Sequence, residues 1–203
     1  IPADELIGMT ESTDPIPGEH VVAAIPMDQR DDDGPTPAPL AIGTRAGVVK
    51  RWNREAPTTM DSWSVIDLKD GDSVLFAADA ADEDRLVFIA SDSSLLTFDA
   101  GNVRPQGRTA GGMAGCTAIT FNVVPAGKIA WTYEEGDNGM FSASGAVVLT
   151  VAGDKDALPG TENGAAKVTP LEMYPTKGRG TGGVRSQRFL KGQNTLIFAR
   201  VGM

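Results

Sequence analysis

The chain has 203 residues and a formal net charge of −9, and 41% of its residues are hydrophobic while 22% are charged. This balance is that of a globular protein long enough to bury a core, and it excludes an intrinsically disordered chain. No run of 18 apolar residues is present, so no membrane-spanning helix is expected. With Cys116 and His20 as its only cysteine and histidine, the sequence excludes an internal disulfide and a Cys/His zinc site, and we expect neither a metal nor a cofactor.

Short apolar runs follow one another along the chain, separated by Gly, Asp, Asn and Pro. Most are about four to seven residues long and rich in β-branched residues, which is typical of strands. Many short strands with frequent turn signals predict an all-β fold. In chain order the runs cover residues 21–25, 40–42, 48–52, 64–68, 74–78, 86–90, 95–98, 117–123, 128–132, 146–151, 185–190 and 195–201.

The runs form a repeating four-stranded unit. Each unit has a first strand, an acidic turn, a hairpin of two strands and, after a long loop, a fourth strand. A period of roughly 50–70 residues with four strands is typical of a propeller-like blade. We therefore predict a single domain over residues 1–203, with about three to four blades in an open or truncated disc. Its expected parts are a leading segment 1–19, repeats at about 20–72, 73–123 and 124–193, and a closing strand 194–203.

Two glycine-rich loops each carry cations and no acidic residue. They occupy the same position in the second and third repeats, between the third and fourth strands. Glycine permits positive φ, and consecutive backbone amides in such a loop form a nest that binds an anion. A tight crossover between blades, which needs glycine only for steric reasons, is the alternative interpretation. The loops read Gln106-Gly107-Arg108-Thr109-Ala110-Gly111-Gly112 and Lys177-Gly178-Arg179-Gly180-Thr181-Gly182-Gly183.

The charge of the chain is unevenly distributed. Residues 1–39 contain nine acids and one cation, a net charge of −8, whereas residues 167–203 contain seven cations and one acid, a net charge of +6. A local field, more than the total charge, decides which partner a surface attracts. The C-terminal part therefore suits a polyanion although the whole chain is acidic.

Two segments resemble the box motif of the C-terminal domain of type IIA bacterial topoisomerase A subunits. They are residues 103–115 and residues 174–192, each built around one of the glycine loops, and residues 40–51 resemble the opening of a blade. The resemblance extends from about residue 20 to residue 203 and is strongest to the topoisomerase IV A subunit (ParC) of actinobacteria. It implies a β-pinwheel, a propeller-like disc whose blades exchange strands and whose basic rim carries duplex DNA.

The resemblance also implies a function and a set of contacts. The domain would bind and bend duplex DNA through its phosphates and guide it to a strand-passage core for relaxation and decatenation, serving DNA topology and chromosome segregation. Since the catalytic tyrosine region is absent, the chain alone would not be an enzyme but part of an ATP-dependent type II topoisomerase, an A2B2 assembly with the ATPase B subunit, cytoplasmic and nucleoid-associated. The expected DNA contacts are Arg104, Gln106, Arg108, Lys177, Arg179, Arg185, Arg188 and Lys191, with Lys50 and Arg51 behind them, and the box glycines are Gly107, Gly111, Gly112, Gly178, Gly180, Gly182 and Gly183.

Three alternatives stay open at this point. The gyrase form of the box has a Gln-Arg-Arg-Gly-Gly-Lys-Gly core, which Thr109, Ala110 and Thr181 dilute here, so weaker guiding is favoured over DNA wrapping by a gyrase A subunit. A propeller-like protein-interaction module, docking a partner through acidic loops, is the alternative from another class. A hydrolase or lyase is disfavoured by the single histidine and the lack of a recognisable nucleophile.

Overall fold

The computed structural model describes residues 21–26, 36–55, 57–60, 62–105, 117–135, 141–158 and 164–203. Strands predominate there, as predicted for an all-β fold, and the helical elements are the 3-10 turns η1 (Ala100–Asn102), η2 (Ala126–Lys128) and η3 (Leu171–Met173). No helix in these ranges is long and apolar enough to span a membrane. The strands are β1 (Leu40–Thr44), β2 (Val49–Trp52), β3 (Val74–Asp79), β4 (Arg85–Ala90), β5 (Ser94–Asp99), β6 (Ala118–Val124), β7 (Thr132–Glu135), β8 (Phe141–Ser144), β9 (Val147–Gly153), β10 (Ala165–Pro170), β11 (Val184–Arg185) and β12 (Thr195–Gly202).

Three antiparallel sheets share one strand order. In each, two strands form a hairpin, and a third returns after a long loop to pair with the first strand of that hairpin. We call these sheets the first blade (β2-β1-β3), the second blade (β5-β4-β6) and the third blade (β10-β9-β12). The returning strand shifts register near its start in all three, beside Thr44, Ala90 and Leu196. A bulge repeated at one place shows that the three blades are copies of one unit.

The second blade receives a strand from the chain of the third. β11 lies in the loop between β10 and β12, yet it pairs with the outer edge of the second blade, Val184 opposite Leu95 and Arg185 opposite Ser94. The second blade thus has the order β11-β5-β4-β6. This exchange is what distinguishes the expected pinwheel from blades that are each built from one continuous segment.

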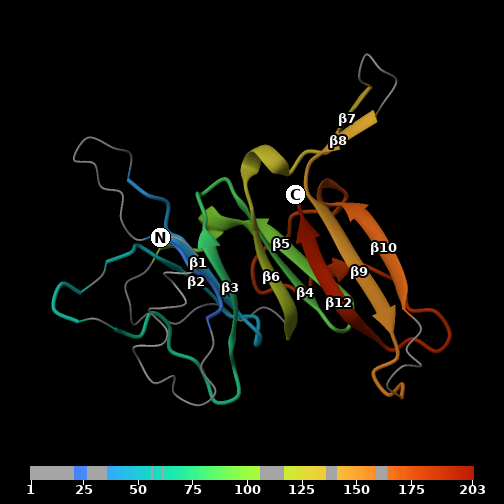
Figure 1. Cartoon of the computed structure of the whole chain (residues 1–203), viewed down its shortest axis with the longest axis horizontal. Coiled ribbons are helices and arrows are strands. Elements are labelled where there is room, and N and C mark those ends of the chain that lie inside the picture. Colours follow the sequence, from blue (N-terminus) through green and yellow to red (C-terminus); the bar gives the residue numbers. More distant parts are fainter. Residues whose placement is uncertain are drawn as a thin grey trace, which may run out of the picture.

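The core lies between neighbouring blades, which stand side by side in Figure 1. Phe88, Phe98 and Phe121 fill the space between the first and second blades, where the rings of Phe88 and Phe121 have centroids 4.6 Å apart. Burying one such side chain stabilises the fold by about 1.5–3 kcal/mol. Ile89 of the second blade and Val148 of the third belong to the equivalent cluster between those two blades. Each blade is therefore held mainly by its neighbours.

Some large apolar side chains lie outside these clusters. Phe198 of β12 is 47% exposed, and Val168 of β10 is 62% exposed. Val148, on β9, belongs to the cluster with the second blade, whereas Leu149 next to it points to the opposite face, because side chains alternate along a strand. Val168 and Arg200 lie opposite Leu149 in the ladder and share that outer face. Within the described residues, this face of the third blade has no neighbouring blade.

Several predicted strands differ in the structure. Residues 21–25 and 64–68 form no strand; Ile25, Val65 and Ile66 pack as irregular segments against Leu40, Ile42 and Trp52 of the first blade. Both edges of β1 are already taken by β2 and β3, so neither segment can add to it. The run 185–190 contains a single strand residue, Arg185 at the end of β11, and the run 128–132 begins in η2 and ends in β7.

The repeat boundaries also differ from those predicted. The sequence places residues 74–78 at the start of the second repeat, but β3 pairs with β1, so the first blade extends through Asp79. In the same way β12, expected as a separate closing strand, pairs with β9 inside the third blade. The sequence thus assigns β3 to the repeat after its own blade and leaves β12 outside the blade to which it belongs.

Candidate nucleic-acid interface

The loop that contains the second glycine motif crosses the outer edge of the second blade. We call residues 175–193, between η3 and β12, the strap. Its backbone leaves the blade after Lys177, whose N–H donates to Thr97 O at 2.9 Å, and returns at Val184, where β11 begins. The intervening residues 178–182 are exposed. The glycine motif is therefore a short excursion into solvent between two points fixed on β5.

The glycines at the exposed part of the strap meet different steric requirements. Gly183 has a φ of 70°, and a Cβ on it would lie 2.3 Å from Leu95 O, so the strap can approach β5 only without a side chain. Gly180 also has a positive φ, of 73°. A Cβ on Gly182 would meet no atom within 4 Å, and one on Gly178 only Thr181 Cγ2 at 3.9 Å. The steric interpretation explains Gly183, whereas the open space at Gly182 leaves the backbone accessible to a ligand.

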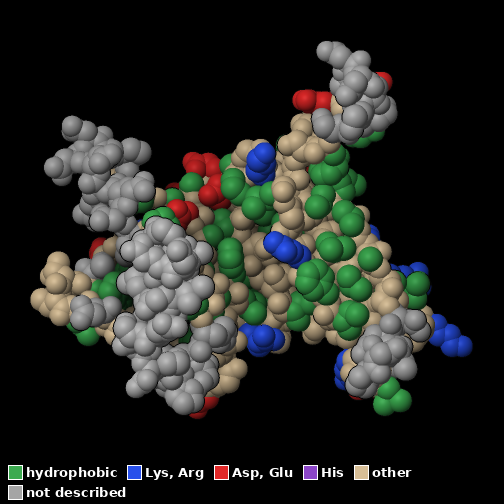
Figure 2. All heavy atoms as spheres, viewed as in Figure 1, with side chains coloured by type: hydrophobic (Ala, Val, Ile, Leu, Met, Phe, Trp, Pro, Cys, Tyr) green, Lys and Arg blue, Asp and Glu red, His purple; other side chains and the backbone are tan. Residues whose placement is uncertain are grey.

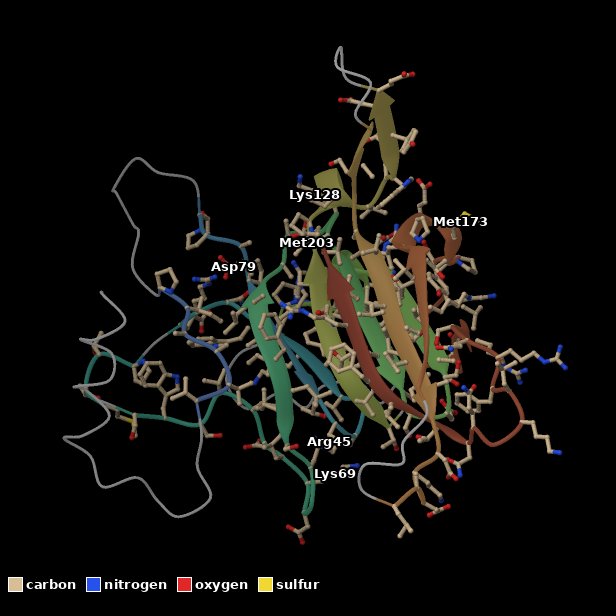
Figure 3. The ribbon with its side chains drawn as sticks, turned by 45° about the vertical axis from the view of Figure 1, so that its right-hand side comes forward. Arg45, Lys69, Asp79, Lys128, Met173 and Met203 are labelled. Carbon is tan, nitrogen blue, oxygen red and sulfur yellow. The ribbon has the colours of Figure 1, made fainter. Side chains whose placement is uncertain are left out.

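Five cations extend from the strap into solvent. Lys177, Arg179, Arg185, Arg188 and Lys191 are all exposed, and none forms an ion pair with an acid in the described ranges, where the ion pairs involve other arginines. Figure 3 shows nitrogen-tipped side chains extending away from the fold along the orange-red loop below Met173. In Figure 2, blue groups lie at the right-hand edge and also near the middle of the face, while most red groups lie at the left and top. The strap is therefore a basic edge on an acidic protein.

A buried polar network anchors the returning end of the strap. Ser93 and Ser186 are 1% and 0% exposed, and the Ser186 N–H and hydroxyl both donate to Ser93 O, at 2.8 and 2.9 Å. The hydroxyl of Ser93 accepts from the Gln187 N–H at 2.8 Å and donates to Gln187 O at 2.6 Å. Lys167 Nζ donates to Ser186 O at 2.7 Å. Arg185 and Arg188 flank this network and so start from a fixed backbone.

Sequence reasoning missed this network. The pair Ser186–Gln187 lies inside the run 185–190, which is predicted as a strand although only Phe189 and Leu190 in it are apolar, and this polar composition was the available signal. The partner Ser93 has a φ of 74°, which is uncommon for a serine and matches the 75° of Gly47 at the tip of the first blade's hairpin. The tip conformation turns the Ser93 side chain and carbonyl toward the strap.

The prediction that Lys50 and Arg51 contact DNA is wrong. Both lie on β2 and are buried, with 0% and 1% exposure. Lys50 Nζ donates to Val65 O at 2.6 Å, and burial lowers the pKa of its ammonium although the charge of Asp67 acts in the opposite direction. The guanidinium of Arg51 is enclosed by backbone carbonyls and Asp82. Neighbouring segments cover β2 on both faces, so neither cation reaches the rim.

The first glycine motif is only partly described. Arg104 is exposed and follows the buried Val103 at the end of η1. The other expected contacts and glycines of this motif lie outside the described residues; they are Gln106, Gly107, Arg108, Gly111 and Gly112. No group of three or more His, Cys, Asp or Glu side chains suited to a metal ion occurs in the described part of the chain.

A family model and the relatives found by sequence point to the same protein family. A model of the DNA gyrase C-terminal domain, beta-propeller, matches residues 160–201, the segment that contains the strap. The DNA gyrase A protein of Mycobacterium leprae (strain TN) is 28% identical over 166 residues, covering 80% of this chain and 11% of that protein. The DNA gyrase A protein of Kosmotoga olearia is 31% identical over 150 residues, covering 72% of this chain and 16% of that protein. The chain thus spans only a small part of the length of these relatives.

A solved structure supports the fold. The crystal structure of the C-terminal domain of DNA topoisomerase IV aligns with a TM-score of 0.53 at 14% identity, covering 95% of this chain and 69% of that one. The relatives found by sequence are named gyrase A, so a specific likeness to ParC is not confirmed. The sequence similarity and the shared fold together identify the chain as a C-terminal domain of the DNA gyrase A and topoisomerase IV A type.

Proposed function

We propose that this domain binds duplex DNA along the strap and guides it toward the strand-passage core of a type II topoisomerase. The observation that carries the proposal is the set of five exposed strap cations that no described carboxylate neutralises. Such cations displace counterions from the phosphate backbone, which supplies most of the affinity of non-specific DNA binding. The domain itself has a non-catalytic role.

The shape of the basic edge favours phosphate contacts over base readout. The strap is a loop lying along a sheet edge, and the described residues hold no helix long enough to enter the major groove. Contacts to phosphates fix the path of the duplex but carry no sequence information. Smoothly bending a site of 20–30 base pairs costs about 1–6 kcal/mol, so phosphate contacts from several spaced cations are needed to offset it. We therefore expect bending with little sequence preference.

Within the family, the diluted glycine loops favour a topoisomerase IV-like role. Compared with the Gln-Arg-Arg-Gly-Gly-Lys-Gly core of the gyrase box, the two loops are diluted by Thr109, Ala110 and Thr181 and hold fewer cations. Fewer phosphate contacts suit the guiding of a DNA segment for relaxation or decatenation better than tight wrapping, which is the gyrase alternative. In the complete enzyme the domain would belong to an A2B2 assembly with the ATPase B subunit, in the bacterial cytoplasm at the nucleoid.

Titration with salt tests the proposal. Binding of a 30-base-pair duplex is followed by fluorescence anisotropy, and the logarithm of the association constant is plotted against the logarithm of the salt concentration. Each phosphate contact contributes about −0.9 to the slope. Replacing Arg108 and Arg179 with Ala removes one cation from each glycine loop and should flatten the slope by about two units. The matched control is Lys155→Ala, an exposed cation outside the strap, which should leave the slope unchanged. An unchanged slope in the double variant refutes the assignment.

One observation favours the second candidate, a protein-interaction module. The β7–β8 hairpin projects from the disc (Figure 1), all four residues of β7 are exposed, and Glu134 and Glu135 make it acidic. A gel-shift series separates the two candidates. No shift of any duplex at 25 mM salt favours the interaction module, whereas a shift that weakens steeply with salt favours DNA binding.

A further inference from the structure

Arg51 connects three segments that are far apart in the sequence. It lies on β2 of the first blade with 1% exposure. One terminal nitrogen, Nη1, donates to Ala100 O at 3.0 Å and to Val103 O at 3.1 Å. The other, Nη2, donates to Ala80 O at 2.9 Å and to Asp82 Oδ1 at 2.6 Å. The planar guanidinium thus joins β2 to the link between the first two blades and to the turn η1.

The two carbonyls held by Nη1 are those at the start and the end of the turn that leads to Arg104. Ala100 begins η1, and Val103 follows it, with the Val103 N–H donating to Ala100 O at 2.9 Å. The carbonyl of Val103 and the nitrogen of Arg104 belong to one planar peptide unit. Holding Val103 O therefore fixes the plane from which the exposed Arg104 side chain departs.

The third blade repeats this turn without the arginine. Leu171 N–H donates to Ala146 O and Tyr174 N–H to Leu171 O, as Ala100 N–H does to Asp84 O and Val103 N–H to Ala100 O. Thr97 of β5 occupies the position in the second blade that Arg51 occupies in the first. Its hydroxyl has no hydrogen-bond partner in the described part of the structure. The strap is held by the Ser93–Ser186 network instead, so Arg51 acts on one glycine motif only.

We propose that Arg51 is a positioning residue for DNA binding, acting through Arg104. This inference rests on the proposed function, because it assumes that Arg104 contacts a phosphate. Arg51 itself is enclosed and its charge is paired with Asp82, so it makes no contact with DNA. Its role is to orient the peptide unit that carries Arg104 and leads into the first glycine motif.

The salt dependence of DNA binding tests this role, because its slope reports the number of phosphate contacts, whereas a loss of folded protein that is equal at every salt concentration shifts the plot without changing its slope. In the 203-residue chain, Arg51→Met and Arg104→Ala should each flatten the slope by about 0.9, and the double variant by no more than either alone. Adding Arg179→Ala, on the independently anchored strap, to the Arg51→Met variant should flatten the slope by about a further 0.9. Arg51→Lys keeps a buried cation but cannot bridge the same carbonyls, and it should flatten the slope as Arg51→Met does.

Arg54→Met is the matched control. Arg54 is also a buried arginine, but it donates to Ala38 O and Pro26 O and pairs with Asp79, away from η1. It should leave the slope at the wild-type value. Two outcomes would overturn this inference and leave the proposed function standing. One is a wild-type slope in both Arg51 variants, and the other is a further flattening of the slope when Arg104→Ala is added to either of them. Absence of any DNA binding by the unsubstituted chain overturns the proposed function and the inference with it.

Discussion

Two adjacent glycines of the strap should respond very differently to the same substitution. At Gly183, alanine must adopt a φ of 70°, which costs about 1–2 kcal/mol for a residue with a Cβ. Its Cβ would also lie 2.3 Å from Leu95 O and 2.7 Å from Leu95 C, and backbone atoms of β5 cannot move aside. The strap must shift instead, which weakens hydrogen bonds worth about 0.5–1.5 kcal/mol each. Gly183→Ala should therefore lower the free energy of unfolding by about 2–4 kcal/mol.

Gly182→Ala provides the comparison. A Cβ there meets nothing within 4 Å, and its backbone is not in the left-handed region, so the free energy should change by less than about 1 kcal/mol. Urea unfolding followed by circular dichroism measures both, with a shift in midpoint at constant m-value as the signature. Equal effects of the two substitutions would refute the account of how the strap packs on β5.

Three further predictions concern stability. Phe88→Ala, at a side chain 1% exposed, should cost about 3–5 kcal/mol in urea unfolding, whereas Phe198→Ala, at 47% exposure, should cost under about 1.5; similar losses would contradict the assignment of the core. Ser186→Ala leaves the buried Ser93 O with one donor fewer and should cost about 1–2 kcal/mol, and no loss would show that water replaces the hydroxyl. Desolvation acts to raise the pKa of Asp72, but hydrogen bonds from the Ala46 and Ser73 amides and the Thr44 hydroxyl, together with the charge of Arg45, outweigh it and lower the pKa below 3.8. The stability that Asp72 adds over Asp72→Asn should therefore be full above pH 3.8 and decline below it, and a difference independent of pH refutes this.

Local patterns in the sequence predict the blade hairpins well. β1–β2 and β4–β5 lie within a residue or two of the predicted runs, because each strand is a short apolar segment and a turn signal marks the tip between them. The strap cations are also found from the sequence alone, since a cluster of basic residues beside glycines in an acidic chain has few structural explanations. Lys177 and Arg179 are exposed in the structure as that interpretation requires.

Arg51 shows where such reasoning fails. A Lys–Arg pair beside Trp52 has the composition of a solvated strand end, and nothing within ten residues indicates otherwise. Its partners Ala80, Ala100 and Val103 come from segments about 30 to 50 residues away and meet it only when the blades stack. Tertiary contacts, not local propensity, decide these features.

The measurement that tests the central claim most directly is the salt slope of the unsubstituted 203-residue chain on two duplexes of equal length and unrelated sequence. With three to five of the strap cations on phosphates together with Arg104 and Arg108, the slope should lie between about −4.5 and −6.3. The two sequences should give the same slope and similar affinity, because phosphate contacts carry no sequence information. A slope near zero, or binding of one sequence only, would contradict a basic edge that receives the DNA backbone.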